Sequence, residues 1–490
     1  MVHYVFNNFT NAYEYLTKRF GGFFVRRFIT LAFMFQMLIS MGIALYAPSL
    51  SFSAATDNDT WIFVLFAGII CTIYTTIGGL RAVVWVDVVQ AIIMLVVQII
   101  ILIKSFSDAG GAAYVWEYNV NASKIKSPEF KFDIYEANGF WNMFIYSFNI
   151  WAIFSVNQVA MQRCLACKSE THGKIALVST WPINVVVIGI SCLIGLTLAA
   201  FYDQRDLKSE GEIESYDQLL TYYVKSWEGW NGFLGLYCAA LYSGAISTVS
   251  SSQNVLAQLT IDDFYEPIFG KIEENRKKMI VRVLMLVYGV FAILLAWVAS
   301  KLGDLLRPTL SIISTFMGPF LGLFLASLVK FVDVSSTICG TALGFGLSLW
   351  LCIGTLTYDI DASDGYQGLE KFYGMSYLLL AAFGAVSSFI LILISKPFLL
   401  VGKILLEKLG LTESFTHFCI KNDYKVSYQD DNELIDNKSI GETVWTLSSV
   451  KNFVTGSKSL VTCHKFVCDM SPNFLGSVPY ACRDDQRRRM

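Results

Sequence analysis

Charged side chains are scarce in this chain. Asp, Glu, Lys and Arg make up 16% of its 490 residues, the net charge is −2, and hydrophobic residues account for 54%. A near-neutral chain without a basic stripe lacks the electrostatic footprint of a nucleic-acid-binding protein. So little charge among so many apolar residues is typical of polytopic membrane proteins. We therefore expect the lipid bilayer as a partner and no nucleic acid.

Histidine is scarce as well, and this limits the available chemistry. The four histidines all lie outside the long apolar segments: His3, His172, His417 and His464. No His/Cys/Asp/Glu cluster for a transition metal can then be assembled in those segments, and no nucleophile stands beside a base in any of them. We expect no enzyme and no cofactor.

Long apolar runs are what the sequence has in abundance. A membrane-spanning helix needs about 20 apolar residues, and ten segments qualify: 25–49, 61–78, 83–104, 139–161, 175–200, 232–257, 279–301, 306–330, 334–357 and 374–397. They predict an all-α polytopic membrane protein. The predicted divisions are a cytoplasmic N-terminal segment at 1–24, a transmembrane domain at 25–397 and a cytoplasmic, partly disordered tail at 398–490.

Basic residues alternate from one connection to the next. They precede the first segment and follow the second, fourth and sixth: Lys18, Arg19, Arg26, Arg27, Arg81, Arg163, Lys168, Lys174, Lys271, Arg276, Lys277 and Lys278. The remaining connections are acidic or polar. Because Lys and Arg concentrate in cytoplasmic loops, we expect a multi-pass protein of the plasma membrane with both ends of this chain in the cytoplasm.

Glycosylation sequons give an independent view of this topology. Asn58 and Asn121 begin sequons in loops that the alternation places outside, where glycosylation can occur. The sequons at Asn8 and Asn437 fall on the cytoplasmic ends and are expected to stay unmodified.

The most unusual run is Tyr242–Ser252 (YSGAISTVSSS), which lies inside the sixth apolar segment. Within it, Ser243, Ser247, Ser250 and Ser251 follow helical spacing and form one oxygen-rich stripe. Neutral oxygen ligands suit a weakly held monovalent cation. A stripe of hydroxyls bonded back to their own helix and packed on a neighbour is the alternative. The residues alone leave both interpretations open.

Three blocks resemble the sodium/solute symporter family, and most closely its monocarboxylate, multivitamin and iodide transporter branch. The first is Gly78–Gln90 (GGLRAVVWVDVVQ), which departs from the family signature at Val86, where Thr is usual. The second is Asn157–Leu165 (NQVAMQRCL), and the third is Tyr242–Tyr265, which resembles the sodium-site helix of the family. The resemblance covers about residues 10–400.

The resemblance implies a LeuT-like inverted-repeat transporter core, in which two sets of five helices surround a site near the membrane midplane. The ten segments would then be core helices three to twelve. Sodium is the coupling ion of the family, and no other metal is expected. Ser247 and Thr248 occupy the positions that supply sodium-binding hydroxyls. Ser251 lies one turn further along and is a third sodium-binding candidate, because that turn contributes to a second sodium site in some relatives.

Asp87 is the most informative charge, because an unpaired carboxylate inside a membrane segment is costly and marks a functional candidate. The resemblance places it on the cytoplasmic exit path of the cation. A structural pair with Arg81, six residues earlier, is the alternative.

Candidate substrate residues come from the fourth and eighth segments: Asn149, Ser155, Leu310 and Ser311. Sugar-carrying relatives place a Tyr at the position of Ile153 and a Gln at that of Ser311. The fifth segment has no Lys or Arg that could bond sugar hydroxyls. A small organic anion, such as a monocarboxylate or a carboxylated vitamin, is therefore favoured over sugar, since helix ends and hydroxyls can hold a carboxylate.

Relatives carry two further core helices ahead of the point where this sequence starts. The first of them supplies carbonyls to the sodium site. We therefore expect either an N-terminally incomplete sodium-coupled symporter, whether a fragment or a mis-started gene model, or a degenerate relative that does not transport and acts as a membrane sensor or partner-binding protein.

Overall fold

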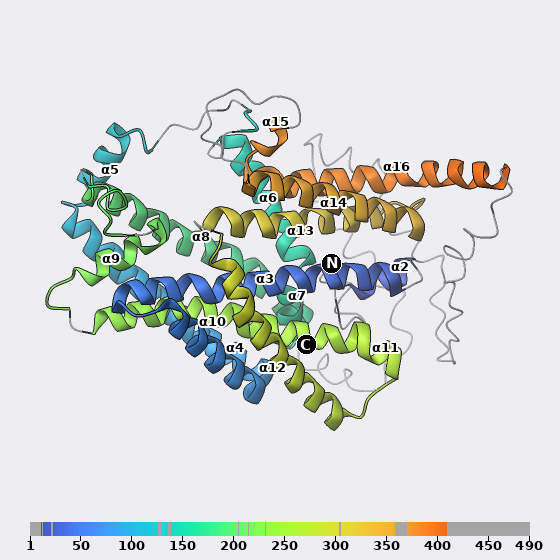
Figure 1. Ribbon diagram of the computed structural model, residues 1–490, viewed down its shortest axis with the longest axis horizontal. Helices are drawn as coiled ribbons and strands as arrows, with labels where there is room; N and C mark the ends of the chain where they lie inside the picture. The colour runs from blue at the N-terminus through green and yellow to red at the C-terminus, as the bar shows by residue number, and fades with distance from the viewer. Residues whose placement is uncertain are drawn as a thin grey trace, which may run out of the picture. The chain divides into compact units, whose positions relative to one another are not determined.

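The computed structural model describes residues 11, 13–20, 23–125, 130, 132–135, 139–203, 205–213, 215–230, 232–302, 305–357 and 370–408. All regular secondary structure in these ranges is helical (Figure 1). The long helices are α3 (Phe23–Thr56), α4 (Thr60–Asp108), α6 (Phe140–Val156), α8 (Glu170–Phe201), α10 (Phe233–Thr260), α12 (Glu274–Ala299), α13 (Leu306–Ser327), α14 (Val334–Thr357) and α16 (Leu380–Lys408). The short elements are α2 (Glu14–Phe20), α5 (Ala112–Asn121), α7 (Gln158–Leu165), η1 (Tyr216–Gln218), α9 (Leu219–Lys225), η2 (Ile261–Tyr265), α11 (Glu266–Phe269), α15 (Glu370–Tyr373) and η3 (Tyr377–Leu379).

Within the described residues, eight helices are long and apolar enough to cross a membrane. Large apolar side chains on their outer faces are exposed, among them Phe66, Ile77 and Trp85, as suits surfaces that face lipid. The expectation of an all-α polytopic membrane protein is confirmed. The number differs from the ten predicted segments because two of them share α4 and one is divided between α6 and α7.

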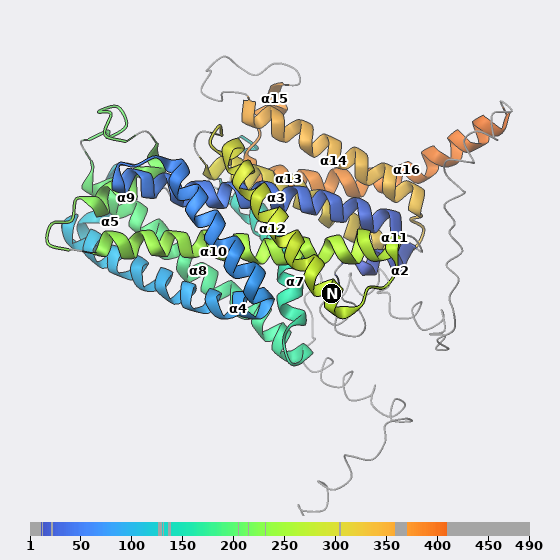
Figure 2. The ribbon, with the colours of Figure 1, turned by 60° about the horizontal axis from the view of Figure 1, so that its bottom comes forward.

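The two predicted segments in α4 meet at a kink. Gly79 has φ 60° and ψ −167°, a backbone conformation outside the helical region that glycine adopts without a steric penalty. Figure 2 shows the first arm (60–78) and the second arm (80–108) diverging from this point, so that the helix folds back on itself. The arms correspond to two separate predicted spans.

The fourth predicted segment is broken at Asn157. This residue has φ −78° and ψ 122°, and its side-chain oxygen accepts a hydrogen bond of 2.7 Å from the backbone N–H of Val159. The asparagine therefore caps the start of α7, which ends the continuous helix α6 one residue earlier. Discontinuous helices of this kind line the central site of inverted-repeat transporters.

Small residues allow α12 to lie close to α3 and to the first arm of α4. A Cβ atom on Gly42 of α3 would lie 2.6 Å from the backbone of Leu295, and one on Gly289 of α12 would lie 2.1 Å from the hydroxyl of Thr72. Helices in a membrane associate through such close packing, because lipid tails are as apolar as the side chains and no hydrophobic effect drives the helices together. These helices and α10 form one packed group.

A second group consists of α13, α14 and α16, which run side by side (Figure 1). Gly318 and Gly322 of α13 face Ala381 and Ala385 of α16, where an added Cβ would lie within 2.5 Å of a carbonyl oxygen. Each glycine pair is spaced by four residues, and Gly340 and Gly344 of α14 repeat the pattern against α16. This is the small-xxx-small packing that membrane helices use.

At the end of the molecule that carries α9, polar contacts link α9 to the second arm of α4 and to the α3–α4 loop. The hydroxyl of Tyr223 donates to Asp108 over 2.7 Å, and Lys225 forms an ion pair of 2.9 Å with Asp57 in the α3–α4 loop. Burial, followed by the hydrogen bond to Asp108, raises the pKa of Tyr223 above its ordinary value. The tyrosine therefore keeps its proton and remains a donor.

We expect Gly344→Ala to destabilise the protein, because the new Cβ would lie 2.0 Å from the hydroxyl oxygen and 2.6 Å from the Cα of Ser388. Overpacking of this kind costs about 1–3 kcal/mol. Gly346→Ala is the matched control, since no neighbouring atom lies within 4 Å of its added Cβ and alanine is the better helix former. Thermal unfolding in detergent measures both; equal stability of the two variants would refute close packing of α14 on α16.

Candidate functional site

The hydroxyls of the predicted cation stripe lie on α10, in the middle of the first packed group. Ser250 and Ser251 are buried, Ser247 is half-buried and Thr248 is exposed. Thr248 donates to the carbonyl of Gly244 over 3.1 Å, and Ser250 donates to that of Ser247 over 3.2 Å. Because a hydroxyl that donates its only proton keeps its lone pairs, this back-bonding leaves oxygen atoms available to a cation. The packing and cation interpretations of the stripe are compatible.

Asp87 lies on the second arm of α4 and faces two other helices. Its Oδ2 accepts a hydrogen bond of 2.8 Å from Nη2 of Arg163 on α7. The same nitrogen lies 2.7 Å from the hydroxyl of Ser251 on α10, to which it donates. The side chain of Ser247 also interacts with the Asp87 carboxylate. The helices α4, α7 and α10 thus bring together a carboxylate, a guanidinium and two of the predicted sodium-site hydroxyls.

The ion pair of Asp87 with Arg163 replaces the alternative pair with Arg81, which is exposed. The sequence alone does not predict that Arg163 pairs with Asp87. A signal was available, because Arg163 belongs to the Asn157–Leu165 block and a membrane-embedded carboxylate requires a partner. The separation of 76 residues between the two side chains hides the pairing from local reasoning.

The carboxyl end of α10 is fixed to α3 by Asp263, which lies in the π-helical turn η2 and is fully buried. Its carboxylate forms an ion pair with Arg26 and accepts a hydrogen bond from Thr30. Its carbonyl accepts a hydrogen bond of 3.1 Å from Arg27. Removing one partner of a buried ion pair costs about 3–5 kcal/mol, so these contacts hold α10 firmly against α3.

A second attachment of α10 involves the first arm of α4 and α12. Gln253 donates to the hydroxyl of Thr72 over 3.0 Å, at the point where Gly289 leaves room for both side chains. At the last residue of α10, the hydroxyl of Thr260 lies 2.6 Å from that of Tyr288 on α12. The hydroxyl stripe is thus carried on a helix held from two sides.

The predicted substrate residues lie on α6 and α13, which pack against each other. Ser311 is fully buried, and its hydroxyl has no hydrogen-bond partner among the described residues. Leu310 is half-buried beside it. Asn149 and Ser155 belong to α6 by their backbone, but their side chains lie outside the described part of the structure. The structure thus brings α6 and α13 together, but of these four candidate residues it describes only the side chains on α13.

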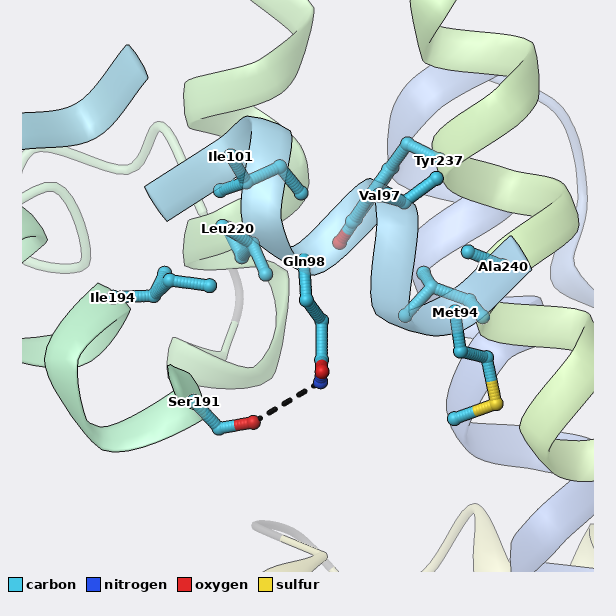
Figure 3. Close-up of a pocket in the computed structure, with 10 residues that line it drawn as sticks. Met94, Val97, Gln98, Ile101, Ser191, Ile194, Leu220, Tyr237 and Ala240 are labelled. Carbon is cyan, nitrogen blue, oxygen red and sulfur yellow. Dashed lines mark hydrogen bonds between the residues drawn. The ribbon is translucent and has the colours of Figure 1, made fainter. Parts of the chain in front are cut away.

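A cavity of about 190 Å³ lies elsewhere, between the second arm of α4, α8, α9 and α10 (Figure 3). Its lining is mostly apolar and includes Val97, Ile194 and Leu220, with one hydrogen bond of 3.2 Å from Gln98 to Ser191. None of the predicted sodium or substrate residues lines this cavity.

The sequons at Asn58 and Asn121 are exposed in the structure. Asn58 lies in the α3–α4 loop and Asn121 ends α5, and Figure 1 places both elements at the same end of the helices, opposite α2 and α11. The sequons at Asn8 and Asn437 lie outside the described residues.

Comparison with known proteins adds independent evidence. The family model described as "Sodium:solute symporter family" matches residues 3–336. A sodium-dependent multivitamin transporter of Oryctolagus cuniculus is 35% identical over 350 residues, which is 71% of this chain and 55% of that protein. Sodium-coupled monocarboxylate transporter 2 of Homo sapiens is 35% identical over 357 residues, 72% of this chain and 58% of the other. The chain therefore spans a little over half the length of these relatives.

Among solved structures, a Na⁺-coupled sialic acid symporter in a substrate-bound outward-open state is similar, with a TM-score of 0.65 and 22% identity. The likeness covers 81% of this chain and 79% of the other. It confirms the LeuT-like transporter fold. The long apolar helices and the matched family show a multi-pass membrane protein. The matched family is one of symporters and not of enzymes. The chain belongs to the sodium:solute symporter family.

Proposed function

We propose that this chain forms the core of a sodium-coupled symporter that carries a small organic anion, a monocarboxylate or a carboxylated vitamin, across the plasma membrane. The names of the relatives support this, since they are sodium-dependent multivitamin and sodium-coupled monocarboxylate transporters. The observation that carries the proposal is the convergence of Asp87, Ser247 and Ser251 from two helices inside the membrane segments.

Sodium binds at Ser247 and Thr248 in this proposal. Both hydroxyls lie on the part of α10 that is incompletely buried, so an ion can reach them. Asp87 supplies the full negative charge near which a cation is stabilised in a medium of low dielectric constant. Ser251, one turn along the helix, and Asp87 together form the route by which the ion leaves toward the cytoplasm.

The anion binds between α6 and α13, where Asn149, Ser155, Leu310 and Ser311 lie on the two packed helices. The buried hydroxyl of Ser311 needs a hydrogen-bond acceptor, and a carboxylate oxygen provides one. Bound sodium supplies a positive charge, which allows an anion to be accepted without a buried arginine. Coupling follows if ion and anion both favour the same conformation, since each ligand shifts the equilibrium by its differential affinity.

Topology gives the first test of this assignment. In a eukaryotic cell, Asn58 and Asn121 are expected to be glycosylated because both are exposed at the end of the molecule assigned to the outside. Asn58→Gln and Asn121→Gln should each remove one glycan, seen as a gel shift after glycosidase treatment. Asn437→Gln should change nothing; a glycan on Asn437 would contradict cytoplasmic termini.

Transport gives the second test. Uptake of radiolabelled lactate, nicotinate, biotin and glucose is compared in sodium and in choline buffer. The cells express either this chain or a form that carries the first two core helices of a relative ahead of Met1. Sodium-dependent uptake of at least one carboxylate, and none of glucose, is expected because the fifth predicted segment and Ser311 offer no set of sugar-bonding side chains.

Two results of that experiment would overturn the assignment. Sodium-dependent glucose uptake without carboxylate uptake would replace the substrate class. Surface expression of both forms without uptake of any compound would favour a non-transporting relative.

A further inference from the structure

Arg163 occupies the acceptors that the proposed cation path offers to sodium. Its Nη2 lies 2.8 Å from Oδ2 of Asp87 and 2.7 Å from the hydroxyl oxygen of Ser251. These two acceptors come from the second arm of α4 and from α10, so the guanidinium joins the two helices across the path. A guanidinium keeps its charge at every physiological pH.

Arg163 bonds only one of the two carboxylate oxygens of Asp87. Its Oδ1 atom is buried and has no hydrogen-bond partner among the described residues, whereas Oδ2 takes the bond from Arg163. Ser247 interacts with the same carboxylate. A buried carboxylate oxygen without a hydrogen-bond partner attracts a second cation, and the hydroxyl of Ser247 can act as a further ligand of that cation.

Arg163 is placed so that its side chain can move away from Asp87. Its side chain remains 47% exposed, although it contacts Asp87, whose side chain is only 16% exposed. It lies in the last turn of α7, a helix of eight residues that begins after the break at Asn157. A long side chain near the end of a short helix can reach either the carboxylate or the solvent without moving a membrane span.

We propose that Arg163 is a tethered counter-cation, which pairs with Asp87 and Ser251 while the path holds no sodium and is displaced when sodium enters. The inference rests on the proposed sodium path and adds a regulatory residue to it. Arg163 thereby closes the cytoplasmic side of the path by charge and keeps the negative Asp87 from remaining unpaired between transport cycles.

Competition between Arg163 and sodium for the same acceptors predicts the direction in which removal of Arg163 changes sodium affinity. The apparent affinity for sodium is reduced by the fraction of time during which Arg163 holds the acceptors. Removing the guanidinium therefore strengthens sodium binding. If Arg163 were only a structural support for Asp87, its removal would weaken sodium binding or leave it unchanged.

The test uses the purified full-length chain in detergent and follows its thermal unfolding temperature during a titration with NaCl, with choline chloride holding ionic strength constant. Arg163→Gln is expected to lower the half-saturating sodium concentration about tenfold relative to the native chain. Arg163→Lys should lower it two- to threefold, because a single ammonium reaches only one of the two acceptors. The lysine variant keeps the test open if the glutamine variant does not fold.

Arg81→Gln is the matched control, since Arg81 lies on the same arm of α4 as Asp87, is exposed and forms no ion pair among the described residues. Its half-saturating sodium concentration should equal that of the native chain. A response of the native chain to sodium that Arg163→Gln leaves unchanged or weakens would overturn the counter-cation and leave the symporter intact. No response of the native chain to sodium, and no sodium-dependent uptake, would overturn both.

Discussion

A carboxylate within a membrane segment must be paired, and the site depends on that constraint. Asp87 cannot remain a lone charge among apolar side chains without a cost of several kcal/mol. The kink at Gly79 turns the second arm of α4 so that Asp87 faces α10, and the break at Asn157 starts the helix from which Arg163 reaches it. The kink at Gly79 and the helix break at Asn157 thus both contribute to the pairing of Asp87.

Contacts at two places hold α10, the helix that carries Ser251, against its neighbours. Asp263 fastens one end of the helix to α3 through Arg26 and Thr30, and Gln253 attaches the helix to Thr72 on the first arm of α4. Close contacts at glycine bring α12 and α16 near their neighbours. The contacts of Asp263 and Gln253 thus hold the helix that carries the hydroxyl stripe, while glycine contacts bring the helices of the second group close together. A helix fixed in this way can present Ser247 and Thr248 in a constant geometry while other elements move.

The sequence predicted the apolar spans, the separation of α4 into two arms and the helix that carries Ser247, because each depends on local composition and on glycine. It did not predict the pair of Asp87 with Arg163, since that contact joins residues 76 positions apart and requires the kink and the helix break together. The burial of the Ser311 hydroxyl likewise depends on how α13 packs against its neighbours. The roles of Asn149 and Ser155 remain predictions, because they were inferred from position along a helix and not from a contact.

The most direct test of the account is the binding of ²²Na⁺ to the purified chain carrying Ser247→Ala and Thr248→Ala, with Ser252→Ala as control. Ser252 is on the same helix, is buried and donates to the carbonyl of Thr248 over 2.7 Å, so its loss tests packing alone. Each lost ion contact is worth roughly 1.5 kcal/mol, or about tenfold in affinity. The account predicts that the double variant binds ²²Na⁺ at least tenfold more weakly while Ser252→Ala binds normally. Equal binding by all three proteins would contradict it and return the hydroxyl stripe to a packing role.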